Sequence, residues 1–220
     1  MREFLTLCKQ QLEFFGPLRR VERQIIGDLF DSAIKKSDHT QSVMNPEHQH
    51  LDNFHTCRSV IFLYQLSRAI YLSDTNDETN LLLAEKLFLL NRHLNSIDLF
   101  FKIELPDFFF INHSLGTVLS RAKYGNFFTV HQGVTVGVQN NHYPVFGERV
   151  TLFPNSVVVG KSVIGNNSVV GAGCVLVNKE IPENSIVFTR NGVLEIKNHE
   201  GLYDPGFFRS DLQLKSEVTK

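Results

Sequence analysis

The stretch from Phe146 to Leu176, FGERVTLFPNSVVVGKSVIGNNSVVGAGCVL, repeats a pattern every six residues. A large apolar residue recurs at this interval, at Phe146, Leu152, Val158, Ile164, Val170 and Leu176. Four residues after each of the middle members stands a small side chain, at Ser156, Ser162, Ser168 and Cys174. Neither an α-helix nor an alternating strand has this period, whereas a parallel β-helix does. The stretch therefore predicts short strands that pack one apolar side chain each into a stack of coils.

The repeat extends toward the N-terminus with one interruption. An earlier register also steps by six and is expected to point inward, at Val118, Tyr124, Val130 and Val136. Ten residues separate Val136 from Phe146, so the segment 137–145, GVQNNHYPV, is expected to form a loop outside the stack. Loops on rigid scaffolds commonly carry function.

Residues 1–101 show helical spacing instead. In PLRRVERQIIGDLFDSAIKK (17–36) the apolar residues recur as on one face of a helix. The polar segment 38–53 is expected to be a loop, and TCRSVIFLYQLSRAIYL (56–72) a second helix. Thr75 and Glu78 have capping-box spacing, which predicts the start of a third helix. These helices are apolar enough to pack against one another and against another subunit.

The two periods predict an α + β fold with three parts. Residues 1–101 form an all-helical N-terminal domain, 102–190 a parallel β-helix of hexapeptide repeats, and 191–220 a C-terminal tail. A chain of 220 residues, 42% hydrophobic, can bury a substantial core.

Charge and cysteine content exclude several classes of partner. The formal net charge is −1, so no nucleic-acid partner is expected. No stretch approaches the ~20 apolar residues that span a bilayer, and MREFLTLCKQQLEFF lacks the core of a signal peptide. The three cysteines, Cys8, Cys57 and Cys174, form no CxxC pair and fit a reducing compartment. We expect a cytoplasmic protein without membrane insertion.

Four motifs carry a family resemblance. NHSLGTV, QGVTVG, HYPVFGERVTL and VVGAGCVLV resemble, in this order, the core of the hexapeptide acyltransferases, and the serine acetyltransferases in particular. The resemblance covers roughly residues 54–188. It implies a left-handed β-helix of three-sided coils, assembled as a homotrimer or a dimer of trimers. It also implies transfer of an acetyl group from acetyl-CoA, bound between neighbouring prisms, to a small hydroxyl acceptor. The helical domain would serve oligomerisation and part of the acceptor site.

The resemblance also assigns catalytic residues. His113 matches the histidine that removes the proton from the acceptor hydroxyl. Glu104, in IELP, is the expected carboxylate partner of this histidine, and Asp98 is the alternative. His142 stands one residue before the place of the second histidine of the family, which Tyr143 occupies.

Further positions are assigned to the acceptor and to the cosubstrate. Asn112 stands where the family has an aspartate that contacts the acceptor, and Asp52 and Tyr143 complete the expected acceptor site. The backbone is expected to face the CoA arm at three places: Gly137, Pro154 and Ala172. No metal or prosthetic group is expected.

The chain departs from the family in its second half. The glycine-rich loop is shortened to GVQNNHYP, and VFTRNGVLEI replaces the glycine-proline motif that contacts CoA. The sequence ends in SEVTK rather than in the isoleucine that docks into cysteine synthase, so this partner is not expected. The acceptor therefore stays open between serine and a sugar of a surface polysaccharide.

Two other classes of function remain. His131 follows His113 by 18 residues, the length of one coil, so the two are expected to stack. Together with His142 they would be the three zinc ligands of a gamma-class carbonic anhydrase, which shares this fold. The other reading is an inactive scaffold. The remaining clustered histidines are expected to belong to a polar loop near the acceptor site: His39, His48, His50 and His55.

Overall fold

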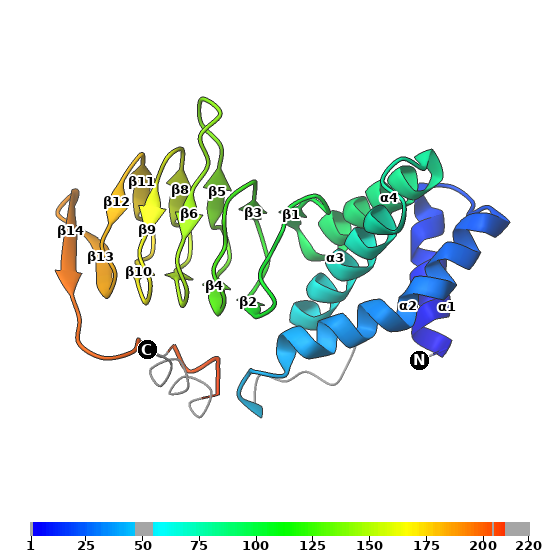
Figure 1. The fold of residues 1–220 in the computed structure, drawn as a ribbon, viewed down its shortest axis with the longest axis horizontal. Coiled ribbons are helices and arrows are strands. Elements are labelled where there is room, and N and C mark those ends of the chain that lie inside the picture. The colour runs from blue at the N-terminus through cyan, green and yellow to red at the C-terminus, as the bar shows by residue number, and fades with distance from the viewer. Residues whose placement is uncertain (1, 47–54, 204, 210–220) are drawn as a thin grey trace.

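The computed structural model describes residues 2–46, 55–203 and 205–209, which form a helical bundle followed by a β-helix (Figure 1). The bundle contains α1 (Arg2–Leu12), the 3-10 helix η1 (Glu13–Phe15), α2 (Arg20–Gln41), α3 (Thr56–Ser73) and α4 (Glu78–Asn95). Its core is apolar and includes Ile26, Phe30, Phe62, Leu66 and Leu87. None of the helices described is long and apolar enough to cross a membrane.

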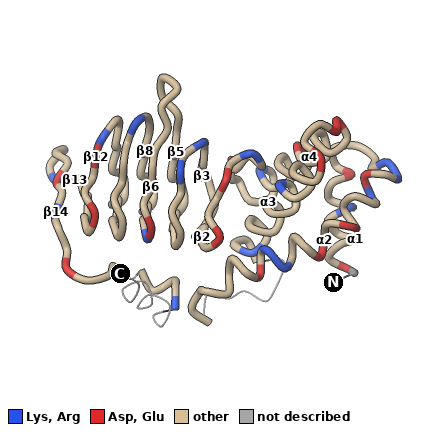
Figure 2. The backbone as a smooth tube through the Cα atoms, in the orientation of Figure 1, with Lys and Arg blue, Asp and Glu red and all other residues tan. Residues whose placement is uncertain are grey.

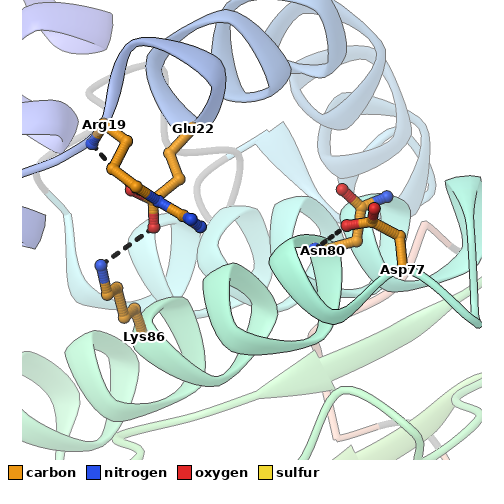
Figure 3. Close-up of polar contacts among 5 residues, drawn as sticks. All are labelled: Arg19, Glu22, Asp77, Asn80 and Lys86. Atoms are coloured by element: carbon orange, nitrogen blue, oxygen red, sulfur yellow. Dashed lines mark hydrogen bonds and ion pairs between the residues drawn. The ribbon is translucent and has the colours of Figure 1, made fainter.

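Two expected helix boundaries are wrong. The segment from residue 38 was expected to be a loop, but α2 continues to Gln41 because Ser37 and Thr40 extend its buried face. The third helix does not start at Thr75. Its N-cap is Asp77, whose carboxylate accepts a hydrogen bond of 2.8 Å from the backbone N–H of Asn80 (Figure 3).

A buried carboxylate joins the start of α2 to α4. Glu22 is 2% exposed and accepts hydrogen bonds from the Arg19 backbone N–H at 2.7 Å and from Lys86 Nζ at 3.0 Å (Figure 3). Burial alone would raise the pKa of Glu22, but these hydrogen bonds outweigh it and hold the pKa below its ordinary value.

The β-helix has three sides. Side 1 consists of β1 (Ile97–Leu99), β3 (Thr117–Leu119), β5 (Thr135–Gly137), β8 (Val157–Val159) and β11 (Val175–Val177). Side 2 consists of β2 (Phe109–Ile111), β4 (Phe128–Val130), β7 (Thr151–Leu152), β10 (Val169–Val170), β13 (Ser185–Arg190) and β14 (Val193–Asn198). Side 3 consists of β6 (Val145–Phe146), β9 (Val163–Ile164) and β12 (Glu180–Ile181). All pairings are parallel except that of β13 with β14. The left-handed β-helix fold is thus confirmed.

The inward register is confirmed for the decisive stretch. All six repeated apolar residues from Phe146 to Leu176 are buried, as are the four small residues at the corners. In the earlier register Val130 and Val136 are buried as expected, but the expectation that Val118 points inward is wrong. Val118 is 36% exposed and Leu119 points inward in its place. The first strand, β1, lies before residue 102 and already pairs with β3.

The C-terminal segment returns along side 2 toward the helical bundle (Figure 1). The His199 ring lies 2.8 Å, Nε2 to oxygen, from the backbone carbonyl of Asn167. Phe208 forms a bridge with Met44, just after α2, and the Asn45 backbone N–H donates to the carbonyl of Phe207. Residues 199–203 and 205–209 therefore cover part of side 2.

Charged residues of both signs are spread over both halves of the molecule (Figure 2). This distribution matches the formal net charge of −1. It gives the described surface no extended field of one sign that would attract a polyelectrolyte.

Candidate active site at one corner of the β-helix

The site is built at the corner where each coil turns from side 2 to side 1. Ile111 pairs with Val130 on side 2, and Val118 pairs with Thr135 on side 1. Six residues (112–117) therefore span the first corner, where four (131–134) span the next. The corners at 153–156 and 171–174 also have four residues. We call these four stacked segments the His113 corner.

The two extra residues carry His113 outward. Its side chain is exposed, and its backbone adopts the left-handed conformation with φ of 52°. This conformation is uncommon for a residue with a Cβ atom, although histidine is among the more tolerant types. The segment is held by the end of α4, because Ser114 Oγ donates to the carbonyl of Asn95 at 2.6 Å. The backbone N–H of Gly116 likewise donates to the carbonyl of Ser96 at 2.9 Å.

The start of α3 also touches this segment. The Cys57 sulfur is buried and faces the backbone N–H of His113. Burial raises the pKa of the Cys57 thiol, and the N–H groups of His113 and of Cys57 itself act in the opposite direction without cancelling it. The thiol is therefore protonated at neutral pH and serves as a packing group. Contacts from α3 and α4 thus hold the segment 112–117 in place.

Asn112 and His131 lie on neighbouring coils. Asn112 Nδ2 is 3.2 Å from His131 Nδ1, and the His131 ring stacks on Phe153 with 4.9 Å between centroids. His131 is 8% exposed, and burial lowers its pKa, as does the nearby His113. His131 is therefore neutral at pH 7. Because the amide donates to Nδ1, the proton of the ring lies on Nε2.

The expected stacking of His131 on His113 is wrong. The coil from Ile111 to its partner Val130 has 19 residues rather than 18, so Asn112 is the residue beside His131. His113 lies one position further along the enlarged corner. The two histidines are close enough for the charge of one to affect the pKa of the other.

Two of the three residues expected to face the CoA arm lie on later segments of the His113 corner. Pro154 is half-buried and Ala172 is exposed, each at the middle of its turn. Gly137 instead ends β5, at the opposite edge of side 1, where it pairs with Val159. Within one chain, the expected cosubstrate residues therefore occupy two corners of the prism.

His142 and Tyr143 belong to the corner that follows β5, where Gly137 lies. The expected loop outside the stack is confirmed as a protrusion between β5 and β6 (Figure 1). Backbone hydrogen bonds of 2.9 Å in both directions join Gln139 and His142. His142 is exposed at the base of this turn, and the Arg121 guanidinium lies 4.9 Å from the centroid of the Tyr143 ring.

The two candidate carboxylates lie on different sides. Asp98 is on β1 opposite Val118, on side 1, and its Oδ2 is 3.7 Å from Arg92 Nη1. Glu104 is exposed in a surface hollow that it shares with Ala122 and Lys123. Lys123 bridges to β6 of side 3, so Glu104 is turned away from the His113 corner. Asp98, by contrast, lies two residues after Ser96, whose carbonyl accepts the hydrogen bond from Gly116 of the His113 corner.

The remaining histidines do not assemble with this site in one chain. His142 and the pair His113 and His131 are at opposite edges of side 1. Within residues 2–46, 55–203 and 205–209, no three His, Cys, Asp or Glu side chains are grouped to hold a metal. His39 lies against Phe108, and His55 caps α3. Asp52, His48 and His50 lie outside the described residues.

Three buried polar atoms of the corner, of His131, Gln132 and Ser156, have no hydrogen-bond partner among the described residues. They are His131 Nε2, Gln132 Oε1 and Ser156 Oγ. Gln132 lies in the quoted motif QGVTVG, and no feature of the sequence singles it out. Phe207, from the C-terminal segment, packs 5.6 Å from the His131 ring, and the hexapeptide repeat does not extend to it.

Comparison with known proteins supports the repeat and its fold. Residues 143–178 match the family model of the bacterial transferase hexapeptide, six repeats. Over 130 residues the chain is 28% identical to the serine acetyltransferase of Bacillus subtilis, covering 50% of this chain and 59% of that protein. Over 83 residues it is 35% identical to the serine acetyltransferase of Mycobacterium tuberculosis, covering 36% of each. The alignments thus span less than two thirds of either relative.

A solved structure has the same fold. Serine acetyltransferase isoform 3 from Entamoeba histolytica, in complex with cysteine, superposes with a TM-score of 0.60. The match covers 96% of this chain and 75% of that one, at 19% identity. The resemblance to hexapeptide-repeat acyltransferases indicated by the motifs is therefore confirmed.

Proposed function

We propose that this chain is an acetyl-CoA-dependent O-acetyltransferase acting on a small hydroxyl acceptor, similar to the serine acetyltransferases. The observation that carries the proposal is the exposed imidazole of His113 on an enlarged corner, held by α3 and α4 and adjacent to the neutral His131. A base fixed at the surface of a rigid prism can meet two substrates that enter from solvent.

His113 acts as the general base in this proposal. A hydroxyl group is a poor nucleophile in its neutral form, so a ring nitrogen of His113 takes its proton as the oxygen attacks the thioester carbonyl. The imidazolium then returns the proton to the departing thiolate, which restores the base. His131 stays uncharged beside it, so it adds no repulsion to the imidazolium at neutral pH.

Asp98, rather than Glu104, is the proposed orienting carboxylate. Asp98 lies on side 1, in the strand that follows the turn to which the His113 corner is hydrogen-bonded. Glu104 lies toward side 3. A carboxylate near His113 would hold its tautomer and stabilise the imidazolium as it forms.

The proposed active assembly is a homotrimer. The outer face of side 1 carries exposed apolar side chains, with Val118, Val175 and Val177 between 36% and 57% exposed. Covering this face with a second copy would bury these side chains. Packing through side 1 would also bring the His113 corner of one chain to the Gly137 corner of the next. His142 and Tyr143 would then complete the acceptor site, and the helical domains would be free to pair two trimers.

The small side chains of the later corners suit the cosubstrate. Gly171, Ala172 and Gly173 follow Pro154 along the prism and leave the surface shallow. An extended acetyl-CoA arm needs such a groove, and backbone N–H groups suit the thioester oxygen. The cytoplasm is the proposed location, because the three buried cysteines are free thiols.

Thiol release from acetyl-CoA tests this proposal. Wild type and His113→Ala are assayed with L-serine and a panel of sugars, and acceptor-dependent release is expected only in the wild type. Loss of a general base typically costs about 10²–10⁴-fold in rate. Equal rates in the two proteins would contradict the role of His113, provided that both show the same thermal unfolding midpoint.

A further inference from the structure

The strongest unassigned feature of the molecule is a hollow where the helical bundle meets the β-helix. It lies between α2, α3 and the segment 104–107, which belongs to the connection from β1 to β2, and its volume is about 450 Å³. Binding sites for small molecules have volumes of this order and commonly lie where two parts of a fold meet. The described residues that line the hollow include none from the His113 corner, so it is separate from the candidate active site.

A buried side-chain amide borders this hollow without a partner. Gln65, on α3, is 8% exposed and makes no side-chain hydrogen bond to any described residue. Buried polar groups are nearly always paired, because an unpaired one loses its hydration without compensation. The Gln65 amide is not among the unpaired atoms that the fold seals from solvent, so a molecule in the hollow can reach it. The amide offers N–H donors and an oxygen acceptor.

Two opposite charges border the hollow without pairing with each other. Arg68 Nη1 donates to the backbone carbonyls of Phe101 and Ile103, at 3.1 and 3.4 Å. Neither Arg68 nor Glu104 forms an ion pair with any residue that the structure describes. Burial raises the pKa of Tyr64, while the charge of Arg68 lowers this pKa and that of Glu104 raises it. Both charges therefore lie near the same hydroxyl group.

The wall that carries these groups is held in place. The Tyr64 hydroxyl donates to the carbonyl of Ile103 at 2.7 Å and accepts from the backbone N–H of Leu105 at 3.2 Å. At the rim, Lys36 and Asp107 form an ion pair, so their charges offset each other. A ligand would thus meet the charges of Arg68 and Glu104 on a wall that is already ordered, which lowers the entropic cost of binding.

This balance of charges selects a ligand that carries both signs. A compound with only a carboxylate would be repelled by Glu104, and one with only an ammonium group would be repelled by Arg68. In a zwitterion each charge can meet an opposite one, which offsets the cost of removing it from water. Charge-assisted hydrogen bonds of this kind are also stronger than neutral ones.

The rest of the hollow is largely apolar. Ala33 lines it from α2, Ala69 and Leu72 line it from α3, and Leu105 lines it from the connecting segment. Leu72 is 54% exposed, so a ligand that covers it would remove apolar surface from water. Such a wall suits an aliphatic or aromatic side chain.

We infer that this hollow is a second binding site, and that its ligand is a free zwitterionic amino acid with an apolar side chain. Arg68 and Gln65 bind the carboxylate of the ligand, and Glu104 binds its ammonium group. The apolar wall takes its side chain. The site lies apart from the acceptor and cosubstrate residues of the proposed acetyl transfer, and it does not depend on that reaction.

The test measures binding to the whole chain by saturation-transfer NMR and by thermal unfolding. The ligands are L-leucine and L-phenylalanine. Three control compounds each lack one recognised group: N-acetyl-L-leucine lacks the ammonium, L-leucinamide the carboxylate, and L-serine the apolar side chain. The variants are Glu104→Gln and Gln65→Met, which keeps the size of the side chain without its amide. Glu180→Gln, exposed on β12, is the matched control.

At least one of the two amino acids is expected to bind to the wild type and to Glu180→Gln, and to raise the unfolding midpoint of both. Loss of a hydrogen-bonded charge partner should weaken this binding about tenfold or more in Glu104→Gln, and loss of a neutral hydrogen bond should weaken it about fivefold in Gln65→Met. The wild type should bind L-leucine more tightly than any of the three control compounds. The preference over N-acetyl-L-leucine should shrink in Glu104→Gln, because the ammonium then has no carboxylate to meet.

Three results would overturn the inference. They are no binding of either amino acid to the wild type, an affinity unchanged by Glu104→Gln, and displacement of bound L-leucine by an equal concentration of L-serine. The last would place L-leucine at the acceptor site. Glu104 is exposed, so its variant is expected to fold, and the test holds even where Gln65→Met does not fold. Acetyl transfer is assayed separately, so the failure of either proposal leaves the other standing.

Discussion

The Asn112 amide nitrogen lies 3.2 Å from Nδ1 of His131, so two side chains from neighbouring coils fix each other at the candidate site. This contact assigns the proton of His131 to Nε2. It also uses one of the two N–H groups of the Asn112 amide.

Replacing Asn112 by Asp should reverse this arrangement. A carboxylate so close to Nδ1 accepts a hydrogen bond from a protonated Nδ1 and favours the imidazolium, so the pKa of His131 should move from below its ordinary value of about 6.5 to above it. Imidazole ¹⁵N shifts followed through a pH titration would show both the change of tautomer and the rise. Asn126→Asp, on another corner, serves as the control. An unchanged His131 titration in Asn112→Asp would contradict the contact.

The two candidate carboxylates can be separated by mutation. Asp98→Asn should lower kcat by about one to two orders of magnitude at nearly constant KM for the acceptor, because it removes the group that stabilises the imidazolium. Glu104→Gln should leave kcat within about twofold, since Glu104 lies in the hollow with Lys123. Steady-state kinetics of acetyl transfer measure both. The opposite ranking would place the orienting carboxylate at Glu104.

Periodicity predicted the inward residues of the regular coils, because one apolar residue every six must point to the axis. It failed where the coil length changes. The coil from Leu119 to its partner Val136 has 17 residues rather than 18, so Leu119 points inward and Val118 faces outward. The coil from Ile111 to its partner Val130 has 19 residues, so Asn112 lies beside His131. A repeat indicates such a change of length only as a broken register, which does not show on which corner or side it lies.

At the candidate site, too, some residues could be predicted from the sequence and others could not. His113, Pro154 and Ala172 were assigned by motif and share one corner. Cys57 and Phe207 reach that corner from the helical bundle and from the C-terminal segment. Such contacts depend on how separate units pack, and a repeat pattern carries no information about them. Glu104 and Asp98 were both candidates from the resemblance, and sequence distance alone does not determine the side of the prism on which each lies.

Side 1 offers a test of the proposed trimer. Val175→Glu would place a charge in the apolar face that we propose a second copy covers, and should shift the protein toward monomer with a parallel loss of acetyl transfer. Val193→Glu is the matched control, because Val193 is 63% exposed and lies on the outer strand β14 of side 2. Light scattering coupled to gel filtration gives the mass of each. A trimer that persists in Val175→Glu would exclude this interface.

The buried Glu22 should make the free energy of unfolding depend on pH in the acidic range. Its pKa is lowered in the folded state, so its contribution is present above the ordinary pKa of about 4.3 and is lost as the pH falls toward the folded value. Glu22→Gln should lower the free energy of unfolding at pH 7 by about 1–3 kcal/mol, because Lys86 loses its partner. The difference should shrink below pH 4. Urea unfolding at pH 7, 5 and 3.5 measures it, and a difference that does not change with pH would contradict the assignment.

A glycine at a coil corner sets the spacing between successive coils. A Cβ atom on Gly165 would lie 2.3 Å from the backbone nitrogen of Glu183, so Gly165→Ala must push two coils apart. We expect a loss of about 1–3 kcal/mol, as for an overpacked core. Gly27→Ala is the matched control: Gly27 lies within α2, and its added Cβ would meet only Lys9 Nζ, at 3.7 Å. This helical substitution should instead stabilise by about 0.5–1 kcal/mol. Chemical unfolding of both variants tests the pair, and equal effects of the same sign would show that the coils do not touch at Gly165.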